Sequence, residues 1–218
     1  MLPLRYWPVT KSSLMKEHKV LIIGDSHTRN CAANVKIDIR DNSEVQELVK
    51  PSAGTDILVN PANNDIMSLQ KSDVLIFCGG ANSDGNKNST KALQYSMDFI
   101  KTKNHTNIIL VTAPPRYDLM QSSCVNSEIK SFNRKLKKMA KVYQQTSVLE
   151  MDNDRKLFAN HDLHLNDQGK GVLFKLIISH TYSILEHKID PPVILNWRSD
   201  QNLTVPQNQV NVINRTST

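Results

Sequence analysis

Short apolar runs rich in β-branched residues recur along this chain of 218 residues, and most of them end at glycine or proline. Residues 19–25 contain one such run, which ends at Gly24. Residues 73–78 form another, which is followed by Gly79 and Gly80. Runs of this length and composition are typical of strands that are buried on both faces of a parallel sheet. Residues 44–49, 107–112 and 147–151 form the other candidate strands. The pattern therefore predicts a parallel sheet of about five strands.

Segments with helical periodicity separate these runs. In residues 125–143 the apolar side chains recur at alternating steps of four and three, which makes one continuous stripe on a helix. Residues 89–101 and 167–187 are the other predicted helices, and Ser122 or Ser123 is expected to cap the helix that follows it. Strands that alternate with helices of this size imply βαβ crossovers, so helices should cover both faces of the sheet.

One domain accounts for most of the chain. We assign residues 1–17 to an N-terminal extension, 18–188 to the α/β domain and 189–218 to a flexible tail, because this last segment is polar and poor in apolar residues. No apolar run approaches the ~18 residues that a membrane span needs, and the N-terminus does not resemble a secretion signal. The three cysteines follow no metal-binding pattern, so we expect reduced thiols, an intracellular (cytoplasmic or nuclear) protein, and neither metal nor cofactor.

The net charge of +6 is compatible with binding to an acidic partner. Much of the excess lies in one predicted helix, and such a run is most often a solvated helix face. Nucleic acid is the alternative partner for this face, although few aromatic residues accompany it. The residues are Lys130, Arg134, Lys135, Lys137, Lys138 and Lys141.

Polar residues and glycines follow the predicted strands where a catalytic site would lie. Ligands of such sheets bind beyond the carboxyl ends of the strands. Ser26 follows the first strand, and a base such as His164 would turn its hydroxyl into a nucleophile. The Gly54 N–H and the Asn82 amide are candidate donors to an oxyanion. Taken singly, each residue also has a simpler explanation: Ser26 as a helix cap, Gly54 and Asn82 as turn residues, His164 as a surface histidine.

Four segments together resemble the SGNH (GDSL-type) hydrolase superfamily in order and in strand context. They are Gly24-Asp25-Ser26, the loop with Gly54, the segment from Gly79 to Asn82, and the segment from Asp162 to Asn166. The resemblance covers about residues 18–187 and implies a flavodoxin-like, three-layer α/β/α domain. It also implies that Ser26 is the nucleophile, that His164 is the base, and that the Ser26 N–H, Gly54 N–H and Asn82 amide form the oxyanion hole.

The last segment departs from the pattern of the superfamily. The acid usually stands three residues before the histidine, and that position is His161 in this chain. Asp162 stands only two residues before His164 and would approach the imidazole from another direction. We therefore expect Asp162 to be a poor substitute for the usual acid, because moving one residue along a loop redirects the side chain. Loss of the orienting acid can lower turnover by about 10⁴.

A closer similarity connects the chain to esterase-like domains of insect sequences, many of them apparently derived from transposable elements. It rests on the stretch after Gly24, on residues 115–119 and 133–137, and on the His161-x-x-His164 spacing, since those domains have the same histidine in place of the acid. Two functions remain open. The first is an intracellular serine esterase acting on O-acyl esters. The second is a weakly active or inactive module of the same fold that binds RNA or protein.

Overall fold

Five parallel strands form the central sheet. The structure is a computed structural model that describes residues 18–39, 43–59, 64–80, 86–151, 153–161 and 163–186, so the proposed extension (1–17) and tail (189–218) lie outside it. The strand order is β2-β1-β3-β4-β5, and every neighbouring pair is parallel. The strands are β1 (His18–Gly24), β2 (Ser43–Val49), β3 (Val74–Cys78), β4 (Asn107–Val111) and β5 (Thr146–Leu149). The predicted parallel sheet is confirmed.

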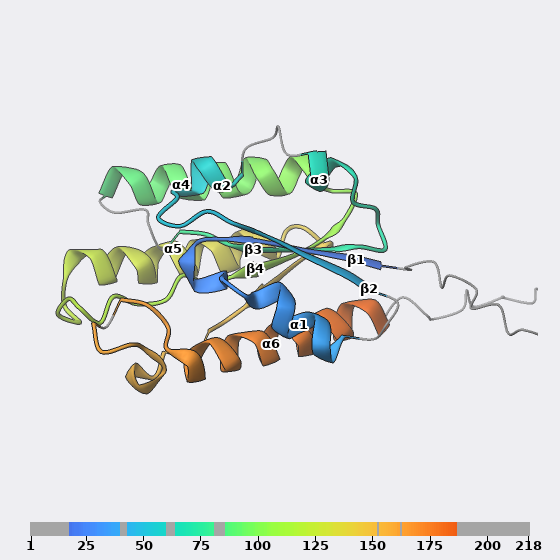
Figure 1. Ribbon diagram of the computed structural model, residues 1–218. Coiled ribbons are helices and arrows are strands. Elements are labelled where there is room, and N and C mark those ends of the chain that lie inside the picture. The colour runs from blue at the N-terminus through green and yellow to red at the C-terminus, as the bar shows by residue number, and fades with distance from the viewer. Residues whose placement is uncertain are drawn as a thin grey trace, which may run out of the picture. The chain divides into compact units, whose positions relative to one another are not determined.

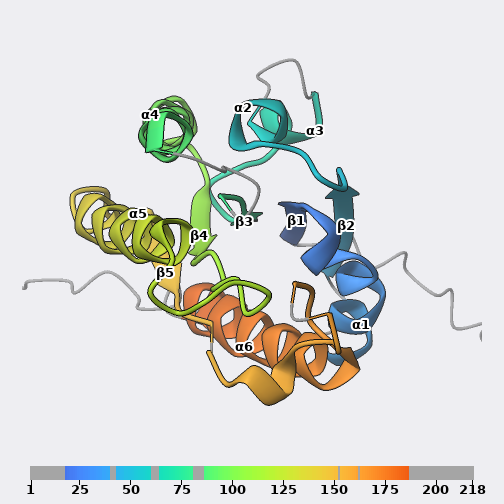
Figure 2. The same ribbon diagram turned by 90° about the vertical axis from the view of Figure 1, so that its left-hand side faces the viewer.

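Helices cover both faces of the sheet, which confirms the three-layer α/β/α architecture (Figures 1 and 2). One face packs against α4 and α5 through a core that includes Phe99 and Phe132. The opposite face packs against α1 and α6 through Val35 and Ile177. The helices are α1 (Cys31–Asp38), α2 (Thr55–Leu58), α3 (Asn64–Met67), α4 (Asn86–Thr102), α5 (Cys124–Ala140) and α6 (Asp167–Glu186); α2 and α3 share the face of α4 and α5.

The three long helices lie where the sequence predicts them, and three shorter ones were not predicted. Ser123 caps α5 by accepting a hydrogen bond from the Asn126 N–H, but α5 ends at Ala140, before the expected end at residue 143. Within α1 the buried residues are Cys31 and Val35, too few to make an apolar stripe in the sequence. The single-turn helices α2 and α3 are shorter than the period that such a pattern needs.

The strand order is the flavodoxin-like one, in which the chain turns in opposite directions from β1 and β3. Ligands of such folds bind at this switch point, beyond the carboxyl ends of the strands. The end of β1 is tightly packed, because a Cβ atom on Gly24 would lie 2.6 Å from Thr28 Cγ2 and 3.0 Å from Cys78 Cβ. Glycine at this position therefore lets the chain turn directly from the buried strand toward the rim of the sheet.

No helix of the described residues is long and apolar enough to cross a membrane. All three cysteines are free thiols, with Cys31 and Cys78 buried and Cys124 exposed. Burial, together with the nearby Glu47 carboxylate, raises the pKa of Cys31 to about 12, so this thiol is not a nucleophile at neutral pH.

Candidate active site

Ser26 begins a single 3-10 turn, η1 (Ser26–Thr28), immediately after β1. The buried Asp25 side chain caps this turn by accepting a hydrogen bond from the His27 N–H at 3.0 Å. The Thr28 hydroxyl donates to the Asp25 carbonyl at 2.9 Å and fixes the other end of the turn. The cap is therefore made by Asp25, and the Ser26 hydroxyl, which the sequence left open as a capping group, has a different partner.

His164 lies on a loop that is fastened to the segment before it. The His164 carbonyl accepts a hydrogen bond from the Ala159 N–H at 2.8 Å, and Phe158 and Leu165 form an antiparallel bridge. The Asn166 side-chain amide donates to the carbonyls of Lys156 and Phe158. Its oxygen accepts from the Gly169 N–H at 2.8 Å, within the first turn of α6. These bonds hold His164 just ahead of the helix, as the sequence predicts.

The side chains of Ser26 and His164 meet at the rim of the sheet. Ser26 Oγ lies 3.3 Å from His164 Nδ1, although 138 residues separate the two positions. Both residues are half-buried, so the pair is reachable from solvent. A hydroxyl beside an imidazole nitrogen that can take its proton is the arrangement that nucleophilic catalysis by serine requires. The predicted contact between Ser26 and His164 is confirmed.

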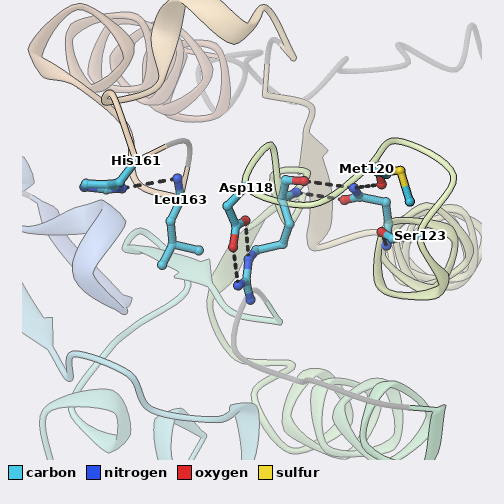
Figure 3. Close-up of polar contacts among 7 residues, drawn as sticks. Asp118, Met120, Ser123, His161 and Leu163 are labelled. Carbon is cyan, nitrogen blue, oxygen red and sulfur yellow. Dashed lines mark hydrogen bonds and ion pairs between the residues drawn. The ribbon is translucent and has the colours of Figure 1, made fainter.

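Two further histidines flank the His164 ring edge-on. The ring centroid of His27 lies 5.4 Å away and that of His161 lies 5.2 Å away. His161 Nδ1 accepts a hydrogen bond from the Leu163 N–H at 3.3 Å (Figure 3). No group of three or more histidine, cysteine or acidic side chains in the described part of the chain could hold a metal ion.

His164 is poised to be neutral at physiological pH. Partial burial lowers its pKa below the ordinary value, and the like charge of His161 lowers it further. Asp25 opposes this shift, whereas Lys170 and Arg116 add to it. A histidine with a lowered pKa is unprotonated at pH 7 and can accept a proton, which is what a general base must do.

The remaining predicted site residues are placed only in part. Gly54 lies at the N-terminus of α2, beyond the carboxyl end of β2, and its carbonyl accepts from the Ile57 and Leu58 N–H groups. Asn82 and Asp162 lie outside the described residues. The oxyanion role of Gly54 and Asn82 and the role of Asp162 as an acid therefore stay predictions.

Sequence reasoning missed several residues around this centre. Arg116 forms a two-pronged ion pair with Asp118, at 2.8 and 2.7 Å, and this hydrogen bonding lowers the pKa of the Asp118 carboxyl. In Figure 3, Asp118 lies between the loop that carries His161 and the loop at Met120. The His161 charge acts on Asp118 as well. The Arg116–Asp118 pair is local to the β4–α5 loop, whereas the approach of His161 to Asp118 joins two separate segments, which no spacing in the sequence predicts. His27, adjacent to Ser26, had a local signal.

A small cavity lies under the turn that carries Ser26. Its volume is about 20 Å³, and its lining includes Asp25, His27 and Thr112. A cavity of this size holds one water molecule and is too small for a substrate. His27 Nδ1 is buried with no hydrogen-bond partner among the described residues, and burial lowers the pKa of this histidine. His27 is therefore neutral, so that it adds no full charge beside His164.

Comparison with solved structures finds proteins described as GDSL-type lipases and esterases that are similar in fold. No protein-family model matches the chain, and no curated protein matches it in sequence. A lipase/acylhydrolase from Enterococcus faecalis is similar in fold, with a TM-score of 0.61 and 18% identity over 76% of this chain and 96% of the other. A member of the lipolytic G-D-S-L family from Veillonella parvula gives 0.61 at 12% identity, covering 74% and 97%. An inhibitor-bound aryl esterase from M. smegmatis gives 0.61 at 11% identity, covering 77% and 100%.

These likenesses establish the fold. The chain has the three-layer α/β/α fold of the SGNH hydrolases. At identities of 11–18% the likeness carries no information on substrate, and nothing in it bears on the similarity to insect or transposable-element sequences. The chemistry has to be argued from the residues themselves.

Proposed function

We propose that this protein is a serine hydrolase that cleaves O-acyl esters through Ser26 and His164. The observation that carries the proposal is the 3.3 Å approach of Ser26 Oγ to His164 Nδ1, on a rim where this fold binds ligands. Serine is a weak nucleophile without a neighbouring base, and the lowered pKa of His164 supplies one at neutral pH.

The reaction follows from this pair. Ser26 Oγ attacks the carbonyl carbon of the ester while His164 Nδ1 takes the hydroxyl proton. The tetrahedral intermediate places a negative charge on the former carbonyl oxygen, which the N–H groups of Ser26 and Gly54 and the Asn82 amide are proposed to stabilise. His164 then gives its proton to the departing alcohol oxygen, leaving an acyl group on Ser26. A water molecule, deprotonated by the same nitrogen, releases the acid and restores the serine.

Orientation of the His164 ring is the weakest part of this site. Since Nδ1 faces Ser26, any orienting group must act on Nε2–H. His161 is a poor acceptor for that proton, because its own Nδ1 already accepts from the Leu163 N–H. Asp162 is the proposed acceptor, and the altered spacing predicts that it acts weakly. We accordingly propose a slow esterase.

Labelling with a fluorophosphonate probe tests the nucleophile directly. The probe forms a bond to an activated serine, so wild-type protein should be labelled and the Ser26→Ala variant should not. Ser122→Ala is a suitable control, because Ser122 is exposed in the loop before α5. Labelling that persists in Ser26→Ala would show that Ser26 is not the nucleophile, and a wild-type protein that never reacts would refute the hydrolase.

A binding module of the same fold is the second candidate, and one observation favours it. The α5 helix exposes a row of cations at helical spacing, whereas Lys137 is paired with Glu150 at 2.9 Å. Such a row can neutralise phosphates in sequence, which makes binding weaken steeply with added salt. A titration of single-stranded RNA at increasing salt tests this. The exposed cations on α5 and at its C-cap are Lys130, Arg134, Lys135, Lys138 and Lys141.

A further inference from the structure

A pocket of ligand size lies between the β4–α5 loop and the first half of α5. Its volume is about 500 Å³, within the range of ~300–1,000 Å³ typical of small-molecule sites. It is distinct from the water-sized cavity under Ser26, although Ala113 lines both. The segment at Asn153 and Arg155 forms the far side. The pocket is therefore large enough for a substrate group of several carbon atoms.

Hydrogen bonds from α5 hold the wall of this pocket in place. The Asn126 side chain accepts from the Arg116 N–H at 2.8 Å and donates to the carbonyls of Arg116 and Met120. Two helical turns further along α5, the Asn133 side-chain amide accepts a hydrogen bond from the Ala113 N–H at 2.9 Å and donates one to the Ala113 carbonyl at 2.8 Å. A wall fixed at both ends is preorganised, so binding there loses little to the ordering of the loop.

Tyr117 ties the same loop to the His164 side of the molecule. Its hydroxyl donates to the Asn153 carbonyl, and its ring packs edge-on against Phe158, with centroids 4.7 Å apart. Phe158 in turn forms the bridge with Leu165, next to the proposed base. Arg116 lines the pocket, and its charge contributes to the lowered pKa of His164. The loop that forms the pocket wall is thus linked, through Tyr117 and Phe158, to the segment that carries His164.

The lining combines apolar surface with positive charge. Leu119, Met120 and Ile129 supply apolar side chains. The charged residues in the described lining are all cations, namely Arg116, Lys130 and Arg155. Asp118 neutralises Arg116 through the two-pronged pair. Lys130 is exposed and makes no ion pair or hydrogen bond within the described part of the chain, so its charge is available to a ligand.

We propose that this pocket selects esters that carry an anionic group, a carboxylate or a phosphate, at the end of a short apolar segment, with Lys130 as the residue that recognises the anion. The inference rests on the proposed hydrolase activity and names its substrate class. The apolar segment would lie on the walls at Leu119 and Ile129. An anion that meets an unpaired ammonium group gains a charge-assisted hydrogen bond, which a neutral substrate of equal length cannot make.

Matched substrates test this selection and distinguish the two places where the anion can sit. For the acyl side, the esters are p-nitrophenyl hydrogen suberate and p-nitrophenyl octanoate, which differ in one terminal carboxylate. For the alcohol side, they are 8-acetoxyoctanoate and octyl acetate. In at least one pair, wild-type kcat/KM should be about five- to tenfold higher for the charged ester. Lys130→Ala should remove this preference, whereas Lys175→Ala, which replaces an exposed lysine on α6, should retain it.

A binding measurement without catalysis separates this inference from the proposed function. In the Ser26→Ala background, octyl phosphate should bind more tightly than octanol in calorimetric titrations. Lys130→Ala should weaken octyl phosphate binding by about fivefold, and Lys175→Ala should leave it unchanged. Equal affinities for octyl phosphate and octanol, or equal effects of the two lysine substitutions, would overturn the pocket assignment. Failure of fluorophosphonate labelling with intact octyl phosphate binding would instead overturn the hydrolase and leave the anion pocket standing.

Discussion

Ser26 Oγ faces Nδ1 of His164, at 3.3 Å, and this choice of ring nitrogen determines what the rest of the site must do. Proton transfer to Nδ1 requires the neutral tautomer that carries its proton on Nε2. The group that orients the ring must therefore accept from Nε2–H. His161 and His27 contact the ring edge-on, and such contacts restrict its tilt without providing a negative charge for the imidazolium.

Replacement of the proposed base should remove activity. His164→Ala takes away the acceptor for the Ser26 proton, and general-base catalysis is worth about 10²–10⁴ in rate. We expect kcat for a p-nitrophenyl ester to fall by ~10³ or more, with the circular dichroism spectrum unchanged. Activity within tenfold of wild type would show that Ser26 is activated by another group.

Substitutions at the altered acid position should have different effects from loss of the base. Asp162→Asn should lower kcat less than about tenfold. A shift of one residue moves the carboxylate by more than the ~0.5 Å tolerance of a working site, so Asp162 contributes little to orienting His164. His161→Asp should raise kcat, since it restores an anion at the position that the superfamily uses. A loss of about 10⁴ in Asp162→Asn, with the fold intact, would contradict this and show that the loop does deliver its carboxylate to His164.

The oxyanion donor can be tested independently of the base. Asn82→Ala should lower kcat by about 10²–10³ if the amide stabilises the tetrahedral intermediate. The effect should lie in kcat, because the donor acts on charge that develops in the transition state. Asn104→Ala is a matched control on an exposed turn. Unchanged turnover in Asn82→Ala would remove this residue from the site without affecting the fold.

The pH dependence of activity follows from the lowered pKa of His164. The base is active when neutral, so kcat/KM should rise with pH through this pKa, and the acid limb should lie below the ordinary histidine value of 6.5. His161→Gln removes a like charge while the site stays polar, which raises the pKa of His164 and moves the limb to higher pH.

The control for this shift is a histidine remote from the rim. His180→Gln, in a pocket at the amino end of β4, should leave the acid limb in place. Titration of the His164 ring by NMR gives the same pKa without substrate. An acid limb that His161→Gln leaves unmoved would mean that the charge of His161 does not lower the pKa of His164.

Two glycines in α6 provide a paired test of how the His164 loop is held. A Cβ atom on Gly169 would lie 2.1 Å from the Leu157 carbonyl oxygen, so Gly169→Ala must separate α6 from the segment that fastens His164. We expect a loss of ~1–3 kcal/mol in the free energy of unfolding, as for other overpacked sites, together with lower activity. Urea denaturation measures the first, and ester hydrolysis the second.

Gly171 is the control for Gly169 in the same helix. Nothing lies within 4 Å of a Cβ atom built there, so Gly171→Ala should add about 0.5–1 kcal/mol of stability by favouring the helix. Equal effects of the two substitutions would show that α6 does not pack against Leu157 as described.

The sequence by itself determined the sheet, the long helices and the meeting of Ser26 with His164. Buried parallel strands need continuous apolar runs, and these runs are visible without any structure. Because parallel strands end at one rim, residues on the loops at this rim can converge, however far apart they are in the chain. The short helix α1 was not predicted, because it buries only Cys31 and Val35 and so shows no apolar stripe in the sequence.

Only the tertiary structure decided which nitrogen of His164 faces Ser26, which rings flank the imidazole, and which pocket Lys130 lines. Each of these depends on side-chain directions in segments that meet only after folding, and residue spacing does not encode such directions. The Tyr117 contacts with Asn153 and Phe158 are an example, since they bring the β4–α5 loop against the loop of the base. Strand positions follow from local apolar patterns, whereas the geometry of the site is a property of contacts between distant segments.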